Sequence, residues 1–170
     1  DCEAGRYQVE PGKATCTACD AGKYGDAEAQ KMDTCKPCGT GKYNSAQGAT
    51  AESQCNLCGA GKYGTRRGQI SEAVGCINCL AGRASPLTGL DNTVTVDQST
   101  PCAPCAMGQF QAASGQASCD ACDAGKYNAE TGRTSSDKCV KCRTGTFSSA
   151  QGASDPSTCN ACPPGKHGNL

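Results

Sequence analysis

The sequence predicts a fold of small disulfide-rich repeats: an elongated rod of about eight serial C-x-x-C units with short β-ribbons, little regular secondary structure and no single core. Three observations lead to this prediction. Cysteine makes up 17 of the 170 residues, a density typical of disulfide or metal scaffolds. The cysteines recur in evenly spaced pairs. Leu, Ile, Val and Phe together number only 14, too few to bury the apolar area that a compact domain of this length needs.

The paired cysteines define the units. Sixteen of them form eight C-x-x-C pairs, and Cys2 is followed by the same A-G-x-Y tail as Cys19, so it is the second half of a ninth pair. The complete pairs are Cys16/Cys19, Cys35/Cys38, Cys55/Cys58, Cys76/Cys79, Cys102/Cys105, Cys119/Cys122, Cys139/Cys142 and Cys159/Cys162. Because the chain opens inside a repeat, we expect a processed chain or a fragment.

A second pattern, C-x-x-G-x-aromatic, starts at the second cysteine of every pair. The glycine is present nine times out of nine, which predicts a position that needs positive φ or close approach to a neighbour. The aromatic slot is filled in all units except those with Ala84 and His167. We expect its occupants to pack structurally, each capping one disulfide layer, rather than to form a ligand-binding ladder. They are Tyr7, Tyr24, Tyr43, Tyr63, Phe110, Tyr127 and Phe147.

The units themselves repeat at a longer period. The spacings from the second cysteine of one pair to the first of the next are 14, 16, 17, 18 and 23, and then restart at 14, 17 and 17. The segment C-D-A-G-K-Y occurs at 19–24 and again at 122–127. We therefore expect a first five-unit super-repeat at 1–103 and a partial second one of three units at 104–170, truncated at both chain ends. In such arrays each unit contacts mainly its neighbours.

The favoured disulfide pairing joins the second cysteine of one pair to the first of the next, so that each closed loop coincides with one repeat. A crossed scheme, with Cys16–Cys35 and Cys19–Cys38, stays open; it would group the units in twos and leave Cys2 alone. The favoured bonds are Cys2–Cys16, Cys19–Cys35, Cys38–Cys55, Cys58–Cys76, Cys79–Cys102, Cys105–Cys119, Cys122–Cys139 and Cys142–Cys159, with Cys162 unpaired in this chain.

Zinc is the alternative use of this cysteine spacing. A Cys₄ site would take two pairs, but every gap looks alike and the tail after each pair shows no grouping in twos. Redox C-x-x-C chemistry needs a βαβ context, which the pattern lacks. We therefore expect oxidised thiols, no metal site and no cofactor.

The pattern C-x-x-G-[KRT]-[YF]…G…C-x-x-C resembles the ephrin-receptor-like cysteine-rich repeat over the whole chain. It is also similar to the first module of tumour-necrosis-factor-receptor repeats, whose loop is closed by a nearest-neighbour disulfide. That resemblance supports the favoured pairing. It implies arrays like those of receptor ectodomains, protist surface antigens and extracellular fibre proteins. The chain departs from the receptor pattern because it lacks the extra crossed disulfide of each module.

Composition excludes several classes of function. The net charge is zero, with 16 basic and 16 acidic residues, and no basic stripe is available for nucleic acid. No apolar run approaches the length of a membrane span. A single histidine, His167, and no assembled nucleophile–base pair speak against an enzyme. The cysteines indicate the secretory pathway and an extracellular or cell-surface location. No N-x-S/T sequon occurs, although Ser and Thr are numerous enough to carry O-glycans.

One segment departs from the repeat. The 85–101 loop is the longest, follows the missing aromatic at Ala84, and contains the alternating stretch 93–97, which is typical of a β-strand. Its aliphatic residues predict an exposed patch or an edge strand that seeks a partner. In the opposing interpretation they fill the gap left by Ala84. The candidate contact residues are Leu87, Leu90, Val94 and Val96.

Two classes of function stay open. The first is an extracellular structural or surface-coat segment, acting as a disulfide-stapled spacer or filament-building array whose partners are other copies of itself or neighbouring extracellular proteins. The second is a ligand-binding ectodomain that recognises a protein partner. A receptor should show one or two units with an individual hydrophobic or charged patch, and in the sequence only the 85–101 loop stands out.

Overall fold

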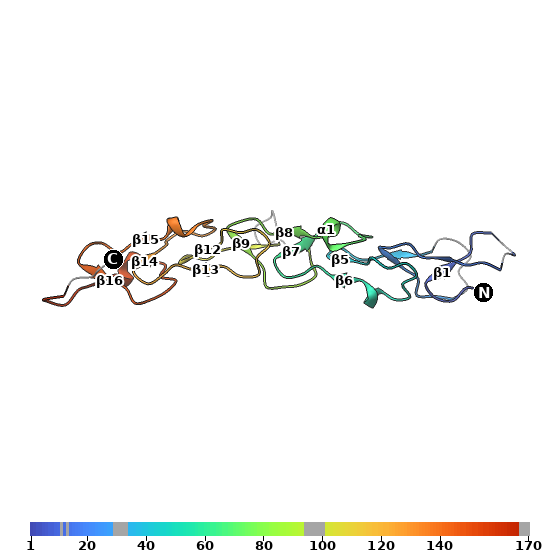
Figure 1. Cartoon of the computed structure of the whole chain (residues 1–170), viewed down its shortest axis with the longest axis horizontal. Coiled ribbons are helices and arrows are strands. Elements are labelled where there is room, and N and C mark those ends of the chain that lie inside the picture. The colour runs from blue at the N-terminus through green and yellow to red at the C-terminus, as the bar shows by residue number, and fades with distance from the viewer. Residues whose placement is uncertain (11, 13, 29–33, 94–100, 167–170) are drawn as a thin grey trace. The chain divides into compact units, whose positions relative to one another are not determined.

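Figure 1 shows a computed structural model of the chain, which describes residues 1–10, 12, 14–28, 34–93 and 101–166. Internal contacts divide the chain into two compact units. Unit 1 comprises Asp1–Ile77 and Leu87–Pro101, and unit 2 comprises Asn78–Pro86 and Cys102–Leu170. The super-repeats 1–103 and 104–170 refer to sequence periodicity rather than to contacts, and they stay a prediction.

Disulfides close the chain into consecutive loops. All seventeen cysteines lie in the described ranges; Cys162 is free, and the others join the second cysteine of one C-x-x-C pair to the first of the next. Their Cα–Cα distances of 5.6–5.8 Å lie in the usual range for a disulfide. Loops 1 to 8 are closed in order by Cys2–Cys16, Cys19–Cys35, Cys38–Cys55, Cys58–Cys76, Cys79–Cys102, Cys105–Cys119, Cys122–Cys139 and Cys142–Cys159.

Each loop carries one short β-ribbon. Its first strand ends at or next to the aromatic slot, and its second strand is the two-residue spacer of the next C-x-x-C pair, so sheet pairing and disulfide hold the same two segments together. The antiparallel pairs are β1 (Arg6–Tyr7) with β2 (Thr17–Ala18), β3 (Lys23–Tyr24) with β4 (Lys36–Pro37), β5 (Lys42–Tyr43) with β6 (Asn56–Leu57), β9 (Arg83–Ala84) with β11 (Ala103–Pro104), β12 (Gln109–Phe110) with β13 (Asp120–Ala121), β14 (Lys126–Tyr127) with β15 (Val140–Lys141), and β16 (Thr146–Phe147) with β17 (Asn160–Ala161).

One sheet has three strands, in the order β10–β7–β8. Strand β7 (Lys62–Gly64) of loop 4 lies between β8 (Ile77–Asn78) and β10 (Leu90–Asp91), and β10 comes from loop 5 and runs parallel to β7. The same contact occurs elsewhere as single parallel bridges, such as Tyr24 with Ala49 and Tyr127 with Ala153. The aromatic slot of one loop is thus the position at which the following loop attaches.

Helical structure in the described residues is confined to single turns that lead into the closing cysteine. These are η1 (Glu52–Gln54), α1 (Glu72–Gly75), η2 (Ser136–Lys138) and η3 (Pro156–Thr158). Ser135 and Asp155 cap η2 and η3, because their side-chain oxygens accept the N–H of Asp137 and Ser157. The prediction of small disulfide-rich repeats with short β-ribbons and little helix is confirmed.

Backbone hydrogen bonds join consecutive loops into a ladder within each unit. In unit 1 the N–H of Gly5 donates to Gly25 (2.8 Å), and the N–H of Gly25 donates to Ala49 (2.9 Å). In unit 2, Gly108 donates to Asn128 (2.7 Å), and Asn128 donates to Ala153 (2.9 Å). Three successive loops therefore share one line of backbone bonds. In Figure 1 these loops succeed one another in chain order, from β1 to β8 in unit 1 and from β12 to β16 in unit 2.

The loops also touch their next-but-one neighbours, in addition to the neighbour contacts that the repeat predicts. A Cβ built on Gly5 of loop 1 would lie 2.3 Å from the carbonyl oxygen of Gly48 in loop 3. Gly108 of loop 6 approaches Gly152 of loop 8 in the same way, at 2.0 Å. Both Gly5 and Gly108 have a φ of +79°. Positive φ and close approach, which the sequence offered as alternatives, occur together.

Burial follows the disulfides rather than an apolar core. Among the described residues, the largest side chains that are almost completely buried are all cysteines: Cys19, Cys38, Cys58, Cys79, Cys102, Cys105 and Cys122. Besides cysteines, the buried apolar side chains in that part of the chain are three alanines and one leucine, namely Ala49, Ala84, Ala153 and Leu90. Cross-links and the backbone ladder therefore supply what apolar packing supplies in an ordinary domain.

Candidate functional site

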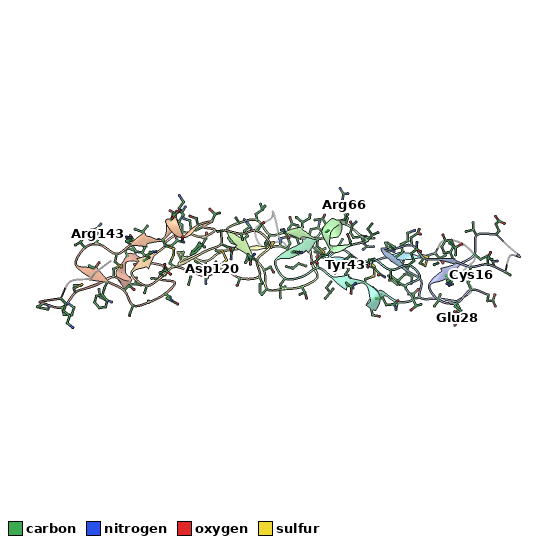
Figure 2. All side chains as sticks on the ribbon, viewed as in Figure 1. Cys16, Glu28, Tyr43, Arg66, Asp120 and Arg143 are labelled. Carbon is green, nitrogen blue, oxygen red and sulfur yellow. A yellow bond between two sulfur atoms is a disulfide. The ribbon has the colours of Figure 1, made fainter. Side chains whose placement is uncertain are left out.

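The aromatic side chains lie at the loop junctions, where six of the seven are half-buried. Phe147, the exception, is 43% exposed. Tyr43 belongs to β5, and its strand position pairs antiparallel with Asn56 on one side and bridges Gln69 of the next loop on the other. Figure 2 shows Tyr43 within the part of unit 1 near β5. These positions are consistent with a packing role, which stays a prediction for the set as a whole.

A buried polar residue directly follows the aromatic slot in five loops, and the sequence reasoning missed it. In four of these loops its side-chain oxygen accepts a hydrogen bond from the backbone N–H of the residue two positions later. Asn44 accepts the N–H of Ala46 and Asn128 accepts the N–H of Glu130, both at 3.0 Å. Asn128 also donates to the carbonyl of Gln109 at 3.1 Å, across to the previous loop. The signal was visible as a polar or glycine residue after every aromatic. The five buried residues are Asn44, Ser85, Gln111, Asn128 and Ser148.

The candidate contact loop is only partly described. Val94 and Val96, like most of the expected strand at 93–97, lie outside the described residues. Leu87 is 61% exposed, whereas Leu90 is 7% exposed and belongs to β10, where it pairs with Tyr63. Leu90 is therefore an internal contact of unit 1 and is no part of an exposed patch.

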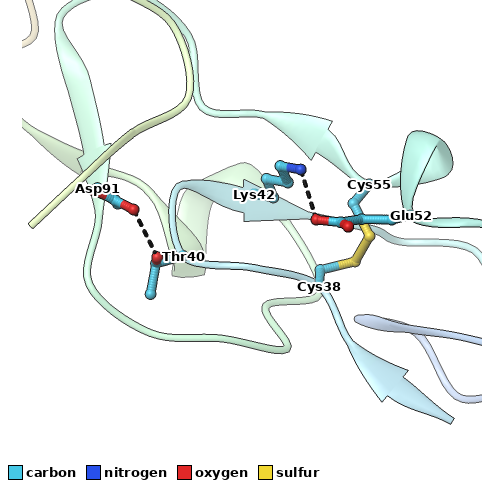
Figure 3. A network of polar contacts seen from close by, with 6 residues as sticks. All are labelled: Cys38, Thr40, Lys42, Glu52, Cys55 and Asp91. Carbon is cyan, nitrogen blue, oxygen red and sulfur yellow. Dashed lines mark hydrogen bonds and ion pairs between the residues drawn. A yellow bond between two sulfur atoms is a disulfide. The ribbon is translucent and has the colours of Figure 1, made fainter. Parts of the chain in front are cut away.

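Polar contacts fix the same segment on loop 3. The Asp91 carboxylate accepts the hydroxyl of Thr40 at 3.0 Å, although the two residues are 51 positions apart (Figure 3). The other carboxylate oxygen accepts the N–H of Thr93 at 3.0 Å and also its hydroxyl. The hydrogen bonds from Thr93, with that from Thr40, hold the pKa of Asp91 below its usual value. The beginning of the long loop is thus held by both loop 3 and loop 4.

Ion pairs occupy a repeated position in loops 3 and 4. Lys42 lies 2.7 Å from Glu52 beside the Cys38–Cys55 bond (Figure 3), and Lys62 lies 3.0 Å from Glu72. In both loops the partners are ten residues apart and link the first strand to the helical turn. Lys62 lowers the pKa of Glu72 through its hydrogen bond and its charge. These exposed pairs contribute little stability individually.

Loop 4 carries an individual surface that the sequence did not single out. Val74 is 68% exposed and Ile77 is 44% exposed, and together with Arg66 they line a hollow of about 220 Å³ in unit 1. Figure 2 shows Arg66 extending away from the ribbon beside α1. We call Arg66, Val74 and Ile77 the loop 4 patch. In this patch two exposed aliphatic side chains and a cation line the same hollow.

Other kinds of site find no support in the described part of the chain. No group of three or more His, Cys, Asp or Glu side chains that could hold a metal ion occurs there. Within the same residues, no helix has both the length and the apolar composition needed to cross a membrane.

Comparison with known proteins agrees with the geometry. The fold and its serial disulfides define a cysteine-rich repeat array. Residues 93–139 match the family described as tyrosine-protein kinase ephrin type A/B receptor-like, which covers loop 6, loop 7 and the end of loop 5. No curated protein matches the chain. The matched family is non-catalytic in this region, and together with the disulfides it indicates an extracellular protein.

Proposed function

We propose that the chain is a disulfide-stapled spacer or array-building segment of an extracellular structural or surface-coat protein. One observation carries the proposal: consecutive loops are joined through groups that are common to the repeats. The ladder from Gly5 to Ala49 and the ladder from Gly108 to Ala153 consist of backbone bonds, and each loop is closed by its own disulfide. Substitution of side chains outside these contacts should therefore leave the loops folded and joined to one another.

The energetics suit a spacer in an oxidising environment. In the chain-entropy model a disulfide that closes about 15 residues stabilises its loop by about 3 kcal/mol. Adjacent loops cannot unfold independently without breaking the backbone ladder. Stability is therefore distributed along the array rather than concentrated in one core.

A cell-surface assay in the native cells tests the proposal. A tagged chain is detected with an antibody on unpermeabilised cells, and its incorporation into the insoluble surface layer is measured. The double variant Cys38→Ser/Cys55→Ser should lose incorporation, whereas the triple variant Arg66→Gln/Val74→Ser/Ile77→Ser should keep it. Loss of incorporation by the triple variant, with normal secretion and disulfides, would overturn the spacer role.

The loop 4 patch favours the second candidate function, a ligand-binding ectodomain. Val74, Ile77 and Arg66 form the unit-specific surface, apolar and charged, that a receptor for a protein partner would need. The same triple variant distinguishes the two functions, because a receptor would lose partner binding while its array stays folded.

We further propose that the partners are other copies of the chain or neighbouring extracellular proteins. Val94 and Val96 stay the candidate contacts for this role. Sedimentation of the double variant Val94→Ser/Val96→Ser should show weaker self-association than the unchanged chain. If self-association is unchanged while Cys79–Cys102 becomes easier to reduce, the segment fills a local gap instead.

A further inference from the structure

Loops 7 and 8 together form a hollow in unit 2. It has a volume of about 450 Å³ and is lined by Tyr127, Arg143, Thr146, Pro156, Ser157 and Cys159. Arg143 follows Cys142 directly, so the Cys142–Cys159 disulfide ties the two walls together. Figure 2 labels Arg143 near the strands of this part of unit 2. The hollow is thus a cross-linked site of a size that suits a small ligand.

The hollow occurs at positions where loops 3 and 4 carry an ion pair and loop 8 does not. Thr146 and Pro156 are ten residues apart and occupy the positions that hold Lys42 and Glu52 in loop 3 and Lys62 and Glu72 in loop 4. Neither Thr146 nor Pro156 can bridge the space with a charged side chain. No long cation with a partner carboxylate therefore occupies these two positions in loop 8.

Among its described lining residues, the hollow contains one cation, Arg143, at a different position of the loop. The residue after the second cysteine is Glu3, Asp20, Gly39, Gly59, Leu80, Ala106, Asp123, Arg143 or Pro163, so loop 8 alone has a basic residue there. Arg143 is exposed, and its guanidinium has no ion-pair or hydrogen-bond partner among the described residues. Its carbonyl accepts the Thr146 hydroxyl at 2.7 Å. The nearby carboxylate of Asp155 is engaged by the Ser157 N–H at 2.7 Å and is not a lining group.

We propose that this hollow binds an acidic sugar, with Arg143 on the carboxylate and the half-buried Tyr127 ring against the sugar face. A guanidinium pairs with a carboxylate through two parallel hydrogen bonds, which neither a neutral sugar nor an amine can provide. The ring of Tyr127 offers an apolar surface with a polar edge, and hydroxyls at Thr146 and Ser157 can bond to sugar hydroxyls. The site is independent of the spacer role, because the side chains proposed to touch the ligand form neither the backbone ladder nor a disulfide.

Titration of the oxidised full chain with D-glucuronic acid and D-glucose, followed by ¹H–¹⁵N NMR, tests the assignment. A ligand of this size in an open site should bind glucuronate with a Kd of about 1 mM. Arg143→Gln should weaken glucuronate binding at least about fivefold, while the control Arg66→Gln, an exposed arginine in loop 4, should leave it unchanged. The double variant Thr146→Lys/Pro156→Glu introduces the ion pair that loops 3 and 4 carry and should abolish binding.

Each outcome decides the matter. Shifts confined to amides around Tyr127, Arg143 and Ser157, lost in Arg143→Gln and in the double variant, support the proposal. Equal binding of glucose and glucuronate, unchanged binding in Arg143→Gln, or no shifts up to about 20 mM glucuronate would each overturn it. Unperturbed spectra of loops 5 and 6 show that each variant is folded. Because surface-layer incorporation is measured separately, failure here leaves the spacer proposal standing.

Discussion

The glycine of the C-x-x-G pattern is required for two reasons, a positive φ and a close contact with another loop. Two positions in this chain allow these reasons to be measured separately. Gly108 and Gly145 occupy the same position in loops 6 and 8, with φ values of +79° and +83°. A Cβ on Gly108 would lie 2.0 Å from the Gly152 oxygen, whereas nothing lies within 4 Å of one on Gly145. Gly145 therefore needs glycine for its backbone conformation alone, and Gly108 needs it for contact as well.

The first prediction compares alanine at these two positions. Gly145→Ala should cost about 1–2 kcal/mol, the penalty of a left-handed conformation for a residue with a Cβ. Gly108→Ala should cost about 1–3 kcal/mol more, because the backbone of loop 8 must move away. Guanidinium unfolding under non-reducing conditions measures both. Equal costs would show that the contact between loops 6 and 8 is unimportant for stability.

The second prediction concerns Asp91 and pH. Hydrogen bonds from Thr93 and Thr40 lower the pKa of this carboxyl in the folded state from 3.8. The stability it contributes is therefore present above pH 3.8 and is lost as the pH falls through the lowered folded pKa. The free energy of unfolding should decrease less over that range in Asp91→Asn than in the unchanged chain. Urea unfolding between pH 5 and about pH 2 measures the difference, with the exposed Glu28→Gln as control; parallel curves for Asp91→Asn and the unchanged chain would contradict it.

At the scale of elements, the strand β10 explains why part of the long loop is internal. Leu90 follows Gly89, as Ala49 follows Gly48 and Ala153 follows Gly152, and all three attach to the aromatic position of the preceding loop. Leu90 therefore fills a place that Ala49, Gln69, Arg133 and Ala153 fill in other loops, and its size gives unit 1 a rare buried aliphatic side chain.

The third prediction concerns the contribution of the buried Leu90 side chain to stability. Leu90→Ala should destabilise unit 1 by about 2 kcal/mol or more, since it removes a buried side chain from a site with few apolar neighbours. Leu80→Ala, at a side chain that is 67% exposed, should change stability by less than about 0.5 kcal/mol. Thermal unfolding with the disulfides intact compares the two variants. A small effect at Leu90 would indicate that backbone bonds alone hold β10.

The fourth prediction concerns the loops as covalent units. Peptide mapping without reduction should find Cys38–Cys55 and Cys122–Cys139, which close loops with 17-residue separations in units 1 and 2. Nearest-neighbour bonds place the two strands of each ribbon side by side, as the pairing of β5 with β6 requires. Peptides that join Cys16 to Cys35 would instead establish the crossed scheme, and free thiols with bound zinc would remove the disulfide framework.

Much of this architecture could be predicted from the sequence, because the cysteine and glycine positions repeat. The contacts between loops could not, although a signal existed. A second glycine follows the first after seven residues in loop 1 and in loops 3 to 8, as Gly41 and Gly48 show. In loops 3 to 8 the N–H of this second glycine donates to the carbonyl of the cysteine that opens the preceding loop, as Gly48 donates to Cys19. The hollow at Arg143 was missed for a different reason: Tyr127 of loop 7 and Arg143 and Pro156 of loop 8 come together only in the folded chain.

At the scale of the whole molecule, the ladder makes the stability of one loop depend on the next two. Gly5 of loop 1 bonds to loop 2 and contacts loop 3, and Gly108 repeats the arrangement in loops 6 to 8. A local change should therefore spread over two or three loops within a unit and fade beyond them, which is the behaviour of a one-dimensional array. Amino-acid composition points the same way, because no large apolar surface is present to draw distant loops together.

The fifth prediction follows from that composition. A compact chain of 170 residues has a radius of gyration of about 15 Å. With only 14 Leu, Ile, Val and Phe residues, the chain has too little apolar surface to collapse around one core, so small-angle scattering of the oxidised protein should give a clearly larger value. Reduction should increase it further and abolish the fold, since the disulfides replace the core. A value near 15 Å for the oxidised chain would mean that the loops pack together into a single body, and the serial array would then have to be abandoned as a description of the whole molecule.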